Sequence, residues 1–206
     1  MNCEFGLRDR RKAATRKALA DAAAHFVLTH GVEGVTAEAI AERAGVSVRT
    51  FHNYFSSKEE AVLAHFEDQI NTWIDDLHSR PADEPILNSL EELTLKLVDD
   101  PNRPLEDTRA MIEIVDYTPS LLVQKQEMHQ RIGERITAAI AERTATDPDR
   151  DLYPHLLAHA GAAICRGALE FWFCGNSDAQ SPAEVIRDGF AQLRAGLPPP
   201  TAPSTH

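Results

Sequence analysis

The sequence predicts an all-α protein of about nine helices, in which a three-helix head at the N-terminus precedes a larger helical body. Apolar residues recur at helical spacing along most of the 206 residues, and no run alternates apolar with polar residues as a half-buried strand does. Helix start and stop signals separate the periodic segments. We therefore expect a head over residues 8–56, a body over residues 57–197 and a disordered Pro-rich tail over residues 198–206.

Three helices are expected in the head. The first covers about residues 10–29 and ends before Gly31, a stop signal. The second begins after Thr36, whose hydroxyl is a good N-cap. Gly45, which can take a positive φ, turns the chain into a short third helix over residues 48–54. A capped helix, a glycine turn and a short helix are typical of a helix-turn-helix.

The body is predicted to contain six further helices. A long helix over about residues 57–78 starts at two overlapping capping boxes, which pair Ser56 and Ser57 with Glu59 and Glu60. After the break RPADEP, the helical pattern resumes in five segments, at about residues 86–99, 105–116, 120–145, 150–174 and 182–196.

Charge is divided unevenly along the chain. The formal net charge is −11, yet residues 1–58 carry nine Lys or Arg and six Asp or Glu, a net +3, so the remainder carries −14. Charges separated by more than a Debye length of about 8–10 Å are largely screened at physiological salt. A basic head surface is therefore compatible with an acidic protein and with a polyanionic partner.

Composition excludes several protein classes. The basic N-terminus lacks the apolar core of a signal peptide, and no apolar run approaches the roughly 20 residues of a membrane span. The three cysteines, Cys3, Cys165 and Cys174, have no metal-ligand spacing, and their odd number favours a reducing cytosol. We expect a soluble cytoplasmic protein with no membrane partner and no cofactor.

The short third helix divides into an apolar edge and a polar edge. At 100° per residue, turning Phe51 toward the core points Arg49 and Asn53 almost the opposite way. His52 then projects to one side. Arg can bridge guanine O6 and N7, and Asn can bridge adenine N6 and N7. Because the second helix of a helix-turn-helix enters the major groove, these side chains are candidate base-reading residues.

A helical hairpin with a merely solvated polar face would show the same spacing. The basic arm in front of the head favours DNA instead. Six Lys or Arg stand against two acids in its seventeen residues, a net +4 suited to contact with the DNA backbone or minor groove. The candidate DNA-binding residues of this arm are Arg8, Arg10 and Arg11.

The run TAEAIAERAGVSVRTFHNYFSSKEEAVL resembles the DNA-binding head of the tetracycline-repressor (TetR) family, and the likeness covers residues 10–63. It has the family's Thr, Ile-Ala, Ala-Gly-Val-Ser, Thr-aromatic, Tyr-Phe and Ser-Lys-Glu groups at matching spacings. The resemblance implies a homodimer whose two heads read a near-palindromic operator in double-stranded DNA, usually as a repressor.

The same resemblance implies roles for individual head residues. It places the recognition helix at residues 47–54, with Ser47 at its start. His52 stands where the family often has Tyr, so its contact is left open. The residues implied to face bases are Val48, Arg49, His52 and Asn53. The residues implied to touch the DNA backbone are Thr36, Thr50, Tyr54 and Lys58.

The last two helices carry small and apolar residues at helical spacing, which could line either a four-helix dimer seam or an ordinary core within one chain. The family resemblance favours the dimer. The candidate interface residues are Leu156, Ala160, Ala163, Ile164, Gly167, Phe171, Ile186, Phe190 and Leu193.

The middle helices are the expected effector site. In the TetR family they surround a ligand cavity, and Met-rich or aromatic walls suit an apolar small molecule. A place in the core is nevertheless the commoner role of any single such residue. The candidate ligand-binding residues are Met111, Ile112, Val115, Met128, Ile132, His159 and Trp172.

Two stretches of the body, TRAMIEIVDYTPSLL and ERITAAIAERTATDPDRDLYPHLLAHAGAAICRGALEFW, carry a second resemblance. They are similar to the TetR subgroup that binds acyl-CoA-like ligands and includes regulators of the mycofactocin system. That likeness implies a fatty acyl or acyl-CoA effector.

His155 and His159 stand one helical turn apart, as two metal ligands can, but a histidine pair on a long helix more often serves packing or solvent contact, and no metal is expected. The chain also lacks a catalytic Ser/His/Asp order, a Gly-rich phosphate loop and an HExxH motif, so we do not expect an enzyme. The rival interpretation is a helical small-molecule carrier or enzyme with a vestigial head.

The combined interpretation is a ligand-responsive DNA-binding transcriptional regulator. Two recognition helices about 34–36 Å apart would fill successive major grooves. Effector binding would swing the long helix at residues 57–78 and spoil that spacing.

Overall fold

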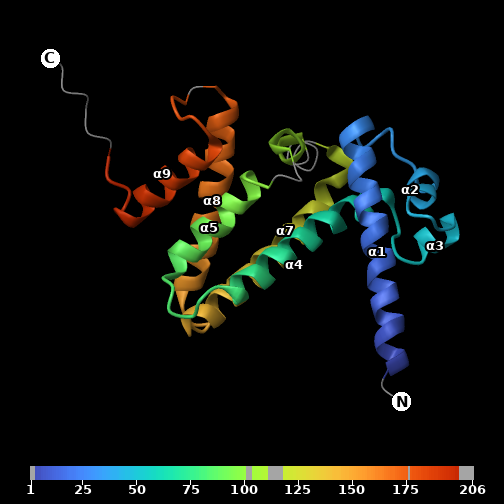
Figure 1. The fold of residues 1–206 in the computed structure, drawn as a ribbon, viewed down its shortest axis with the longest axis horizontal. Coiled ribbons are helices and arrows are strands. Elements are labelled where there is room, and N and C mark those ends of the chain that lie inside the picture. Colours follow the sequence, from blue (N-terminus) through green and yellow to red (C-terminus); the bar gives the residue numbers. More distant parts are fainter. Residues whose placement is uncertain (1–2, 101–103, 111–117, 176, 200–206) are drawn as a thin grey trace. The chain divides into compact units, whose positions relative to one another are not determined.

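The computed structural model describes residues 3–100, 104–110, 118–175 and 177–199, which form helices and their connections (Figure 1). The helices are α1 (Cys3–His30), α2 (Ala37–Arg43), α3 (Val48–His52), α4 (Lys58–Ser79), α5 (Ile86–Val98), the 3-10 turn η1 (Pro119–Leu121), α7 (Leu122–Thr144), α8 (Leu152–Phe173) and α9 (Pro182–Arg194). Residues 105–110 are also helical. Because these described ranges contain no strand, the predicted all-α class is confirmed.

The chain divides into two compact units. The first contains Met1–Trp73 and Arg103–Gly133, and the second contains Ile74–Asn102 and Glu134–His206. The breaks after Trp73 and after Gly133 fall inside helices, so α4 and α7 each contribute residues to both units. The first unit therefore contains the head and also the later segment Arg103–Gly133, whereas the sequence predicted a head that ends at residue 56.

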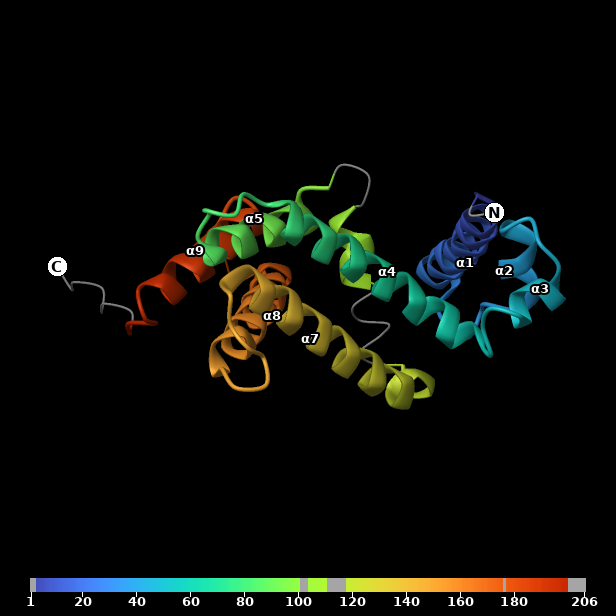
Figure 2. The ribbon, with the colours of Figure 1, turned by 90° about the horizontal axis from the view of Figure 1, so that it is seen from below.

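One apolar core holds the first unit together. Leu19 of α1, Ile40 of α2 and Phe51 of α3 are fully buried in it. Helix α1 contacts α2, and α2 contacts α3, as Figure 2 also shows. Burying a large apolar side chain contributes about 1.5–3 kcal/mol, so this shared core orders three helices that are too short or too polar to persist alone.

The predicted capping residues work as expected. Thr36 Oγ1 accepts a hydrogen bond from the backbone N–H of Ala39 at 3.2 Å, which starts α2. Gly45 has φ +69°, a conformation that favours glycine, and turns the chain toward α3. Ser57 Oγ accepts from the N–H of Glu60 at 3.1 Å, as one of the two predicted capping boxes requires, whereas the Glu60 carboxylate accepts from the N–H of Ser56 at 2.7 Å instead of that of Ser57.

Helix α1 begins earlier than the sequence pattern predicts. It reaches back to Cys3, whereas apolar periodicity placed its start near residue 10. The apolar pattern marks only where α1 meets the core. The arginines and lysines before that point are good helix formers, and residues 8–14 are exposed, so this part of the helix extends without a buried face.

The second unit contains α5, α8 and α9, which pack on one another (Figures 1 and 2). Its buried side chains include Leu93 and Leu169. A Cβ added to Gly189 would lie 2.8 Å from Cγ2 of Ile164, so this glycine lets α9 approach α8 closely.

Two residues expected in the dimer seam belong instead to the core of a single chain. Ile186 and Phe190 are both 0% exposed within the second unit. Ile164, also expected in the seam, is half-buried and packs toward Gly189. The apolar pattern of the last two helices therefore serves intrachain packing in part, which spacing alone does not distinguish from a seam.

A polar cluster connects the loop after α4 with α5 and α7. Glu84 accepts hydrogen bonds from Arg80 Nε at 2.7 Å and from Ser89 Oγ at 2.5 Å. Arg143 of α7 donates to the carbonyls of Arg80 and Pro81 at 3.1 and 2.8 Å. The hydrogen bond from Arg80, followed by that from Ser89, lowers the pKa of Glu84 to about 2.

Replacing this carboxylate is expected to weaken the acid dependence of stability. A folded-state pKa below the ordinary 4.5 means that Glu84 stabilises the fold above about pH 4.5 and loses this effect as pH falls toward 2. The thermal midpoint, followed by circular dichroism from pH 7 to pH 3, should fall more steeply for the native chain than for Glu84→Gln. Asp83→Asn, at an exposed neighbour, is the control. Parallel curves for the native chain and Glu84→Gln would contradict the prediction.

Candidate nucleic-acid interface

Helix α3 is held by its aromatic edge. Phe51 is 0% exposed and the following Phe55 is 2% exposed, with ring centroids 5.9 Å apart. At the helix start, Ser47 Oγ accepts a hydrogen bond from the N–H of Thr50 at 3.1 Å. A cap and a buried edge therefore fix the orientation of this five-residue helix.

The opposite edge of α3 is polar and open to solvent. Arg49, His52 and Asn53 are exposed. The imidazole of His52 stands edge-on to the ring of Phe51, with centroids 5.2 Å apart. Asn53 keeps a helical backbone conformation as the C-cap, so it extends the edge that Arg49 begins. The other expected contact residues of this helix are half-buried and are Val48, Thr50 and Tyr54.

The hydroxyls expected to touch phosphates also bond within the head. Ser47 Oγ and Thr50 Oγ1 lie 2.8 Å apart, and Thr36 Oγ1 caps α2 while remaining at the surface. A hydroxyl both donates and accepts, so each can hold its helix end and still donate to a phosphate.

Lys58 has a partner within the chain. Its Nζ donates to the carbonyl of Val32 at 2.8 Å in a part-buried position, which joins the start of α4 to the turn after α1. An ammonium has three donors. The contact gives Lys58 a role in holding the head, and contact with the DNA backbone stays a prediction.

The basic arm is the first part of α1. Arg8, Arg10 and Arg11 are exposed on this helix. An α-helix with its side chains is about 10–12 Å wide, whereas the minor groove is about 6 Å wide. Of the two expected modes, contact with the backbone fits a helical arm, and insertion of the arm into the minor groove does not.

Two further basic residues of the arm are used inside the first unit. Arg16 Nη1 lies 3.3 Å from Asp68 Oδ1, and its guanidinium carbon lies 5.3 Å from the centroid of the Phe55 ring. Lys17 Nζ lies 2.8 Å from Asp21. Part of the arm's positive charge is thus paired with carboxylates, and the exposed arginines nearer the N-terminus are better placed for a partner.

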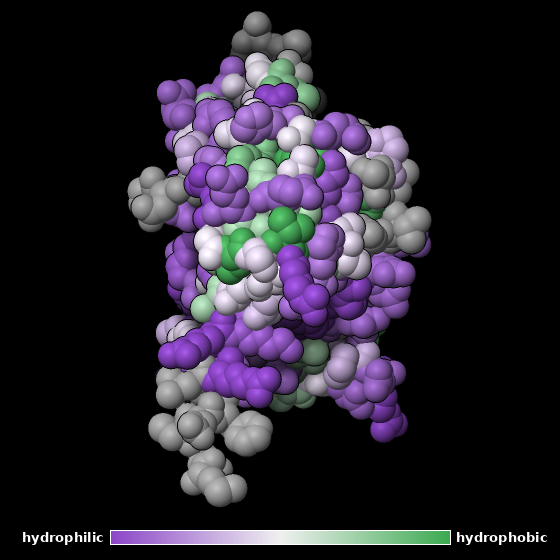
Figure 3. Space-filling model, turned by 90° about the vertical axis from the view of Figure 1, so that its right-hand side faces the viewer, coloured by the Kyte–Doolittle hydropathy of each residue, from purple (hydrophilic) through white to green (hydrophobic). Residues whose placement is uncertain are grey.

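The side of the molecule that carries α2 and α3 is shown in Figure 3. Hydrophilic residues cover most of this face around a small hydrophobic group. Protein–DNA interfaces are more polar than protein–protein interfaces. The surface composition therefore suits a nucleic acid.

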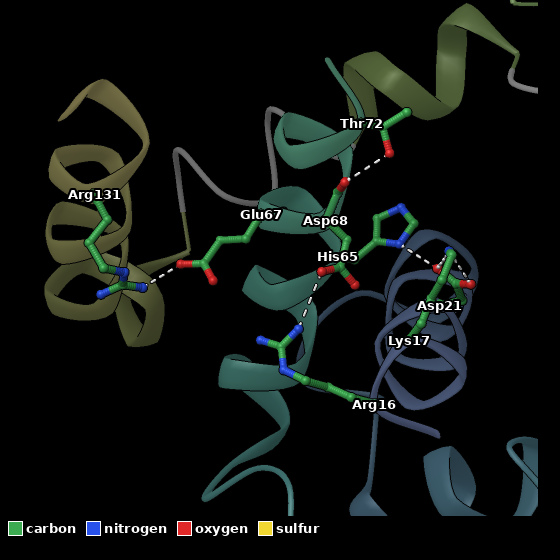
Figure 4. Close-up of polar contacts among 8 residues, drawn as sticks. All are labelled: Arg16, Lys17, Asp21, His65, Glu67, Asp68, Thr72 and Arg131. Carbon is green, nitrogen blue, oxygen red and sulfur yellow. Dashed lines mark hydrogen bonds and ion pairs between the residues drawn. The ribbon is translucent and has the colours of Figure 1, made fainter. Parts of the chain in front are cut away.

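Sequence reasoning missed the ion pairs that connect α1, α4 and α7 (Figure 4). His65 Nδ1 lies 2.9 Å from Asp21 Oδ1, and Glu67 pairs with Arg131. These partners are 44 and 64 positions apart, so no local spacing marks them. Among the ion pairs drawn in Figure 4, that of Lys17 with Asp21 lies within one helix, and its i, i+4 spacing can be recognised in the sequence.

The expected effector residues are not brought together by one unit. Met128 is 1% exposed and Ile132 is half-buried, and both pack in the apolar core of the first unit, which also contains Phe51. His159 is exposed and Trp172 is half-buried, and both belong to the second unit. The other candidates, Met111, Ile112 and Val115, lie outside the described residues.

An apolar stripe runs along the solvent side of α8. Its members fall within a sector about 100° wide, opposite the buried side of the helix. Leu152, Leu156 and Phe171 are 68, 56 and 51% exposed, and a Cβ on Gly167 would meet nothing within 4 Å. Of the expected interface residues, those exposed on this stripe are Leu156, Ala163, Gly167 and Phe171, and those half-buried are Ala160, Ile164 and Leu193.

The two neighbouring histidines of α8 have different surroundings. His155 Nε2 donates to the carbonyl of Pro148 at 2.7 Å, whereas His159 is exposed. No group of three or more metal-binding side chains occurs among the described residues. Burial raises the pKa of the Cys165 thiol to about 11, so this cysteine is protonated at neutral pH.

A glycine turn followed by a short capped helix with an exposed polar edge is the arrangement of a helix-turn-helix, in which the second helix reads DNA. Residues 19–64 match the family of bacterial regulatory proteins named tetR, and residues 84–198 match the MftR C-terminal domain. Because these matches cover more than half of the chain, the protein belongs to the TetR family of transcriptional regulators.

Two relatives are similar along nearly the whole chain. The HTH-type transcriptional regulator TcmR of Streptomyces glaucescens is 29% identical over 199 residues, which cover 93% of this chain and 88% of TcmR. MftR of Mycobacterium tuberculosis, a transcriptional regulator assigned to mycofactocin biosynthesis, is 24% identical over 191 residues, which cover 91% of this chain and 93% of MftR.

A solved TetR-family structure has the same fold. The regulator from Mesorhizobium loti aligns with a TM-score of 0.64 at 21% identity, over 91% of this chain and 96% of its own. None of the described helices combines the length and apolar character that crossing a membrane requires.

Lys58→Met is expected to lower the free energy of unfolding by about 1–2 kcal/mol, because a hydrogen bond from a charged group is removed while the apolar stem is kept. Urea denaturation measures this change. Lys96→Met is the control, since its ammonium pairs with Asp76 on the exposed surface and should change stability by less than about 1 kcal/mol. An unchanged stability, with the salt slope of DNA binding reduced by about 0.9 for each subunit that loses the contact, would instead assign Lys58 to a phosphate.

Proposed function

We propose that the protein is a ligand-responsive repressor, which binds a near-palindromic operator as a homodimer in the cytoplasm and leaves it when a small effector binds. The observation that carries the proposal is the two-sided α3. Phe51 is fully buried in the head, whereas Arg49, His52 and Asn53 are exposed on the other edge. A helix held in this way presents side chains without using them in the fold.

Base reading is assigned to the exposed edge. Arg49 suits guanine, through O6 and N7, and Asn53 suits adenine, through N6 and N7. His52 lies beside them and supplies a further donor or acceptor. Phosphate contacts, assigned to the arm and to the hydroxyls at the helix starts, set the register without reading sequence.

The homodimer is assigned to the apolar stripe of α8. Exposed apolar patches of this kind mark interaction sites. The stripe combines large side chains, Leu156 and Phe171, with the exposed Ala163 and Gly167, which allow close helix approach. A two-fold axis would place the same stripe of a second copy against it.

The effector is proposed to be a small apolar or amphipathic molecule, with a fatty acyl or acyl-CoA compound as the first candidate. The match of residues 84–198 to the MftR C-terminal domain supports the acyl-CoA-binding subgroup that the sequence resembles. For near-complete release, the effector must favour the non-binding state by about 5.5 kcal/mol. A carrier or enzyme with a vestigial head is not favoured, because the relatives found along nearly the whole chain are transcriptional regulators.

Removing the two base-reading side chains should reduce operator affinity but leave the fold intact. Operators are first selected from random DNA with the purified protein. Arg49→Ala with Asn53→Ala should then weaken binding by about 1–3 kcal/mol for each side chain that reads a base, with an unchanged thermal midpoint, because neither side chain is buried. Arg135→Ala with Gln126→Ala, at exposed positions on α7, is the matched control.

The same binding assay gives the salt dependence. If each subunit neutralises about four phosphates, the logarithm of the association constant should fall against the logarithm of salt concentration with a slope of about −7. A slope near zero, or a double variant that binds like the native chain, would refute DNA reading by this surface.

Polar substitutions in the α8 stripe should separate the dimer. Leu156→Ser with Phe171→Ser removes two large apolar side chains, each worth about 1.5–3 kcal/mol when buried and each counted twice in a symmetric interface. The dimer dissociation constant, measured by analytical ultracentrifugation, should rise at least about a hundredfold. Leu197→Ser, which changes a leucine that is 66% exposed beyond α9, is the control. An undiminished dimer in the double variant would move the interface elsewhere.

A further inference from the structure

The first half of α7 is part of the core that holds the recognition helix. Met128 of α7 and Leu121 of η1, the turn just before it, are 1 and 0% exposed, and both belong to the cluster of buried side chains that includes Leu19, Phe51 and Phe55. Ile132 packs against the same cluster. The segment Arg103–Gly133 accordingly joins the head in one compact unit.

Helix α4 lies between α7 and α1 in this unit, and charged side chains connect it to both (Figure 4). Glu67 pairs with Arg131 of α7, whereas the adjacent Asp68 pairs with Arg16 of α1 at 3.3 Å. Two consecutive carboxylates of α4 therefore bind cations on different helices. A displacement of α7 would change the position of α4 and, through Arg16, that of α1.

Arg16 carries this connection to the recognition helix. Its guanidinium carbon lies 5.3 Å from the centroid of the Phe55 ring, and Phe55 packs on Phe51 of α3. The ion pair of Arg131 is partly exposed, with 55 and 20% of its two side chains accessible, and contributes little to stability by itself. Met128 anchors α7 in the shared core, and the pair of Arg131 with Glu67 joins α7 to α4.

We propose that Met128 and Arg131 are positioning residues for DNA reading, which act through α4 and α1 on α3. The inference rests on the proposed operator binding. Helix α7 runs without a break from Leu122 to Thr144, and its last residues belong to the second compact unit. The packing state of α7 and the affinity for operator are then linked.

Linkage makes this testable without knowledge of the effector. If the packing of α7 favours the DNA-binding state, operator binding must strengthen that packing by the same factor. Residues 125–133, to which no DNA contact is assigned, should therefore exchange their amide hydrogens more slowly when the full-length protein binds a selected operator duplex. A coupling free energy of the usual size between two sites changes an equilibrium by about fivefold or more, so amide exchange in these residues should slow by at least that factor. Hydrogen–deuterium exchange measures the change.

Variants separate positioning from general stability. Met128→Ala should speed exchange in α1 and α3 and weaken operator binding about fivefold or more, and Met128→Leu, which keeps the volume, should restore both. Ile140→Ala is the matched control, because Ile140 is 0% exposed on the same helix but belongs to the second unit. It should leave exchange in α1 and α3 unchanged.

A second set of variants does not depend on the stability of the core. Arg131→Glu places like charges together at the surface and should reduce both operator affinity and the DNA-induced slowing in residues 125–133. Combining it with Glu67→Arg should restore both. If the native chain binds operator while exchange in residues 125–133 stays unchanged, positioning by α7 is refuted and DNA reading stands. If the native chain selects no DNA, the proposed function fails, and this inference fails with it.

Discussion

Helix α3 contains only five residues, which is too few for its own hydrogen bonds to keep it helical in water. Its existence depends on the burial of Phe51, with Phe55 beside it, against α1 and α2. Arg49 and Asn53, on the opposite edge, are exposed and do not belong to this core. The identity of the exposed side chains can therefore be chosen for recognition alone, while the fold is maintained by the buried edge.

Basic side chains serve two purposes in the first unit. Arg16 and Arg131 pair with carboxylates of α4 and so connect it to α1 and α7, whereas Lys17 pairs with Asp21 within α1. The arginines of the arm and Arg49 are exposed. A composition does not distinguish paired from unpaired charges. The number of basic residues in the head therefore overstates how many of them are free to contact DNA. A basic side chain that lies within reach of a carboxylate forms an ion pair within the protein, and one that does not stays available to a partner.

The two long helices α4 and α7 contribute to both compact units. The two ends of each of these helices therefore have different surroundings. Met128 and Ile132, which are expected around an effector, pack in the core of the first unit. In the second unit, α5, α8 and α9 pack on one another, and the apolar stripe of α8 is exposed.

Local chemistry determined most of what could be read from the sequence by itself. Apolar periodicity predicted the helices, and capping by Thr36 and Ser57, with the turn at Gly45, marked where they begin. The two edges of α3 followed from helical geometry once Phe51 was assigned to the core. Interactions within a few residues obey short-range rules of spacing, so one sequence is enough to predict them.

Tertiary structure decided what an apolar or charged residue packs against. Ile186 and Phe190 have the same character as the exposed Leu156 and Phe171, yet only the second pair is available to another chain. Arg131 finds Glu67 across 64 positions. An apolar side chain gains from burial against any apolar surface, and a charge gains from any opposite charge in reach. Periodicity therefore predicts that a residue is buried or paired, and only the folded arrangement selects its partner.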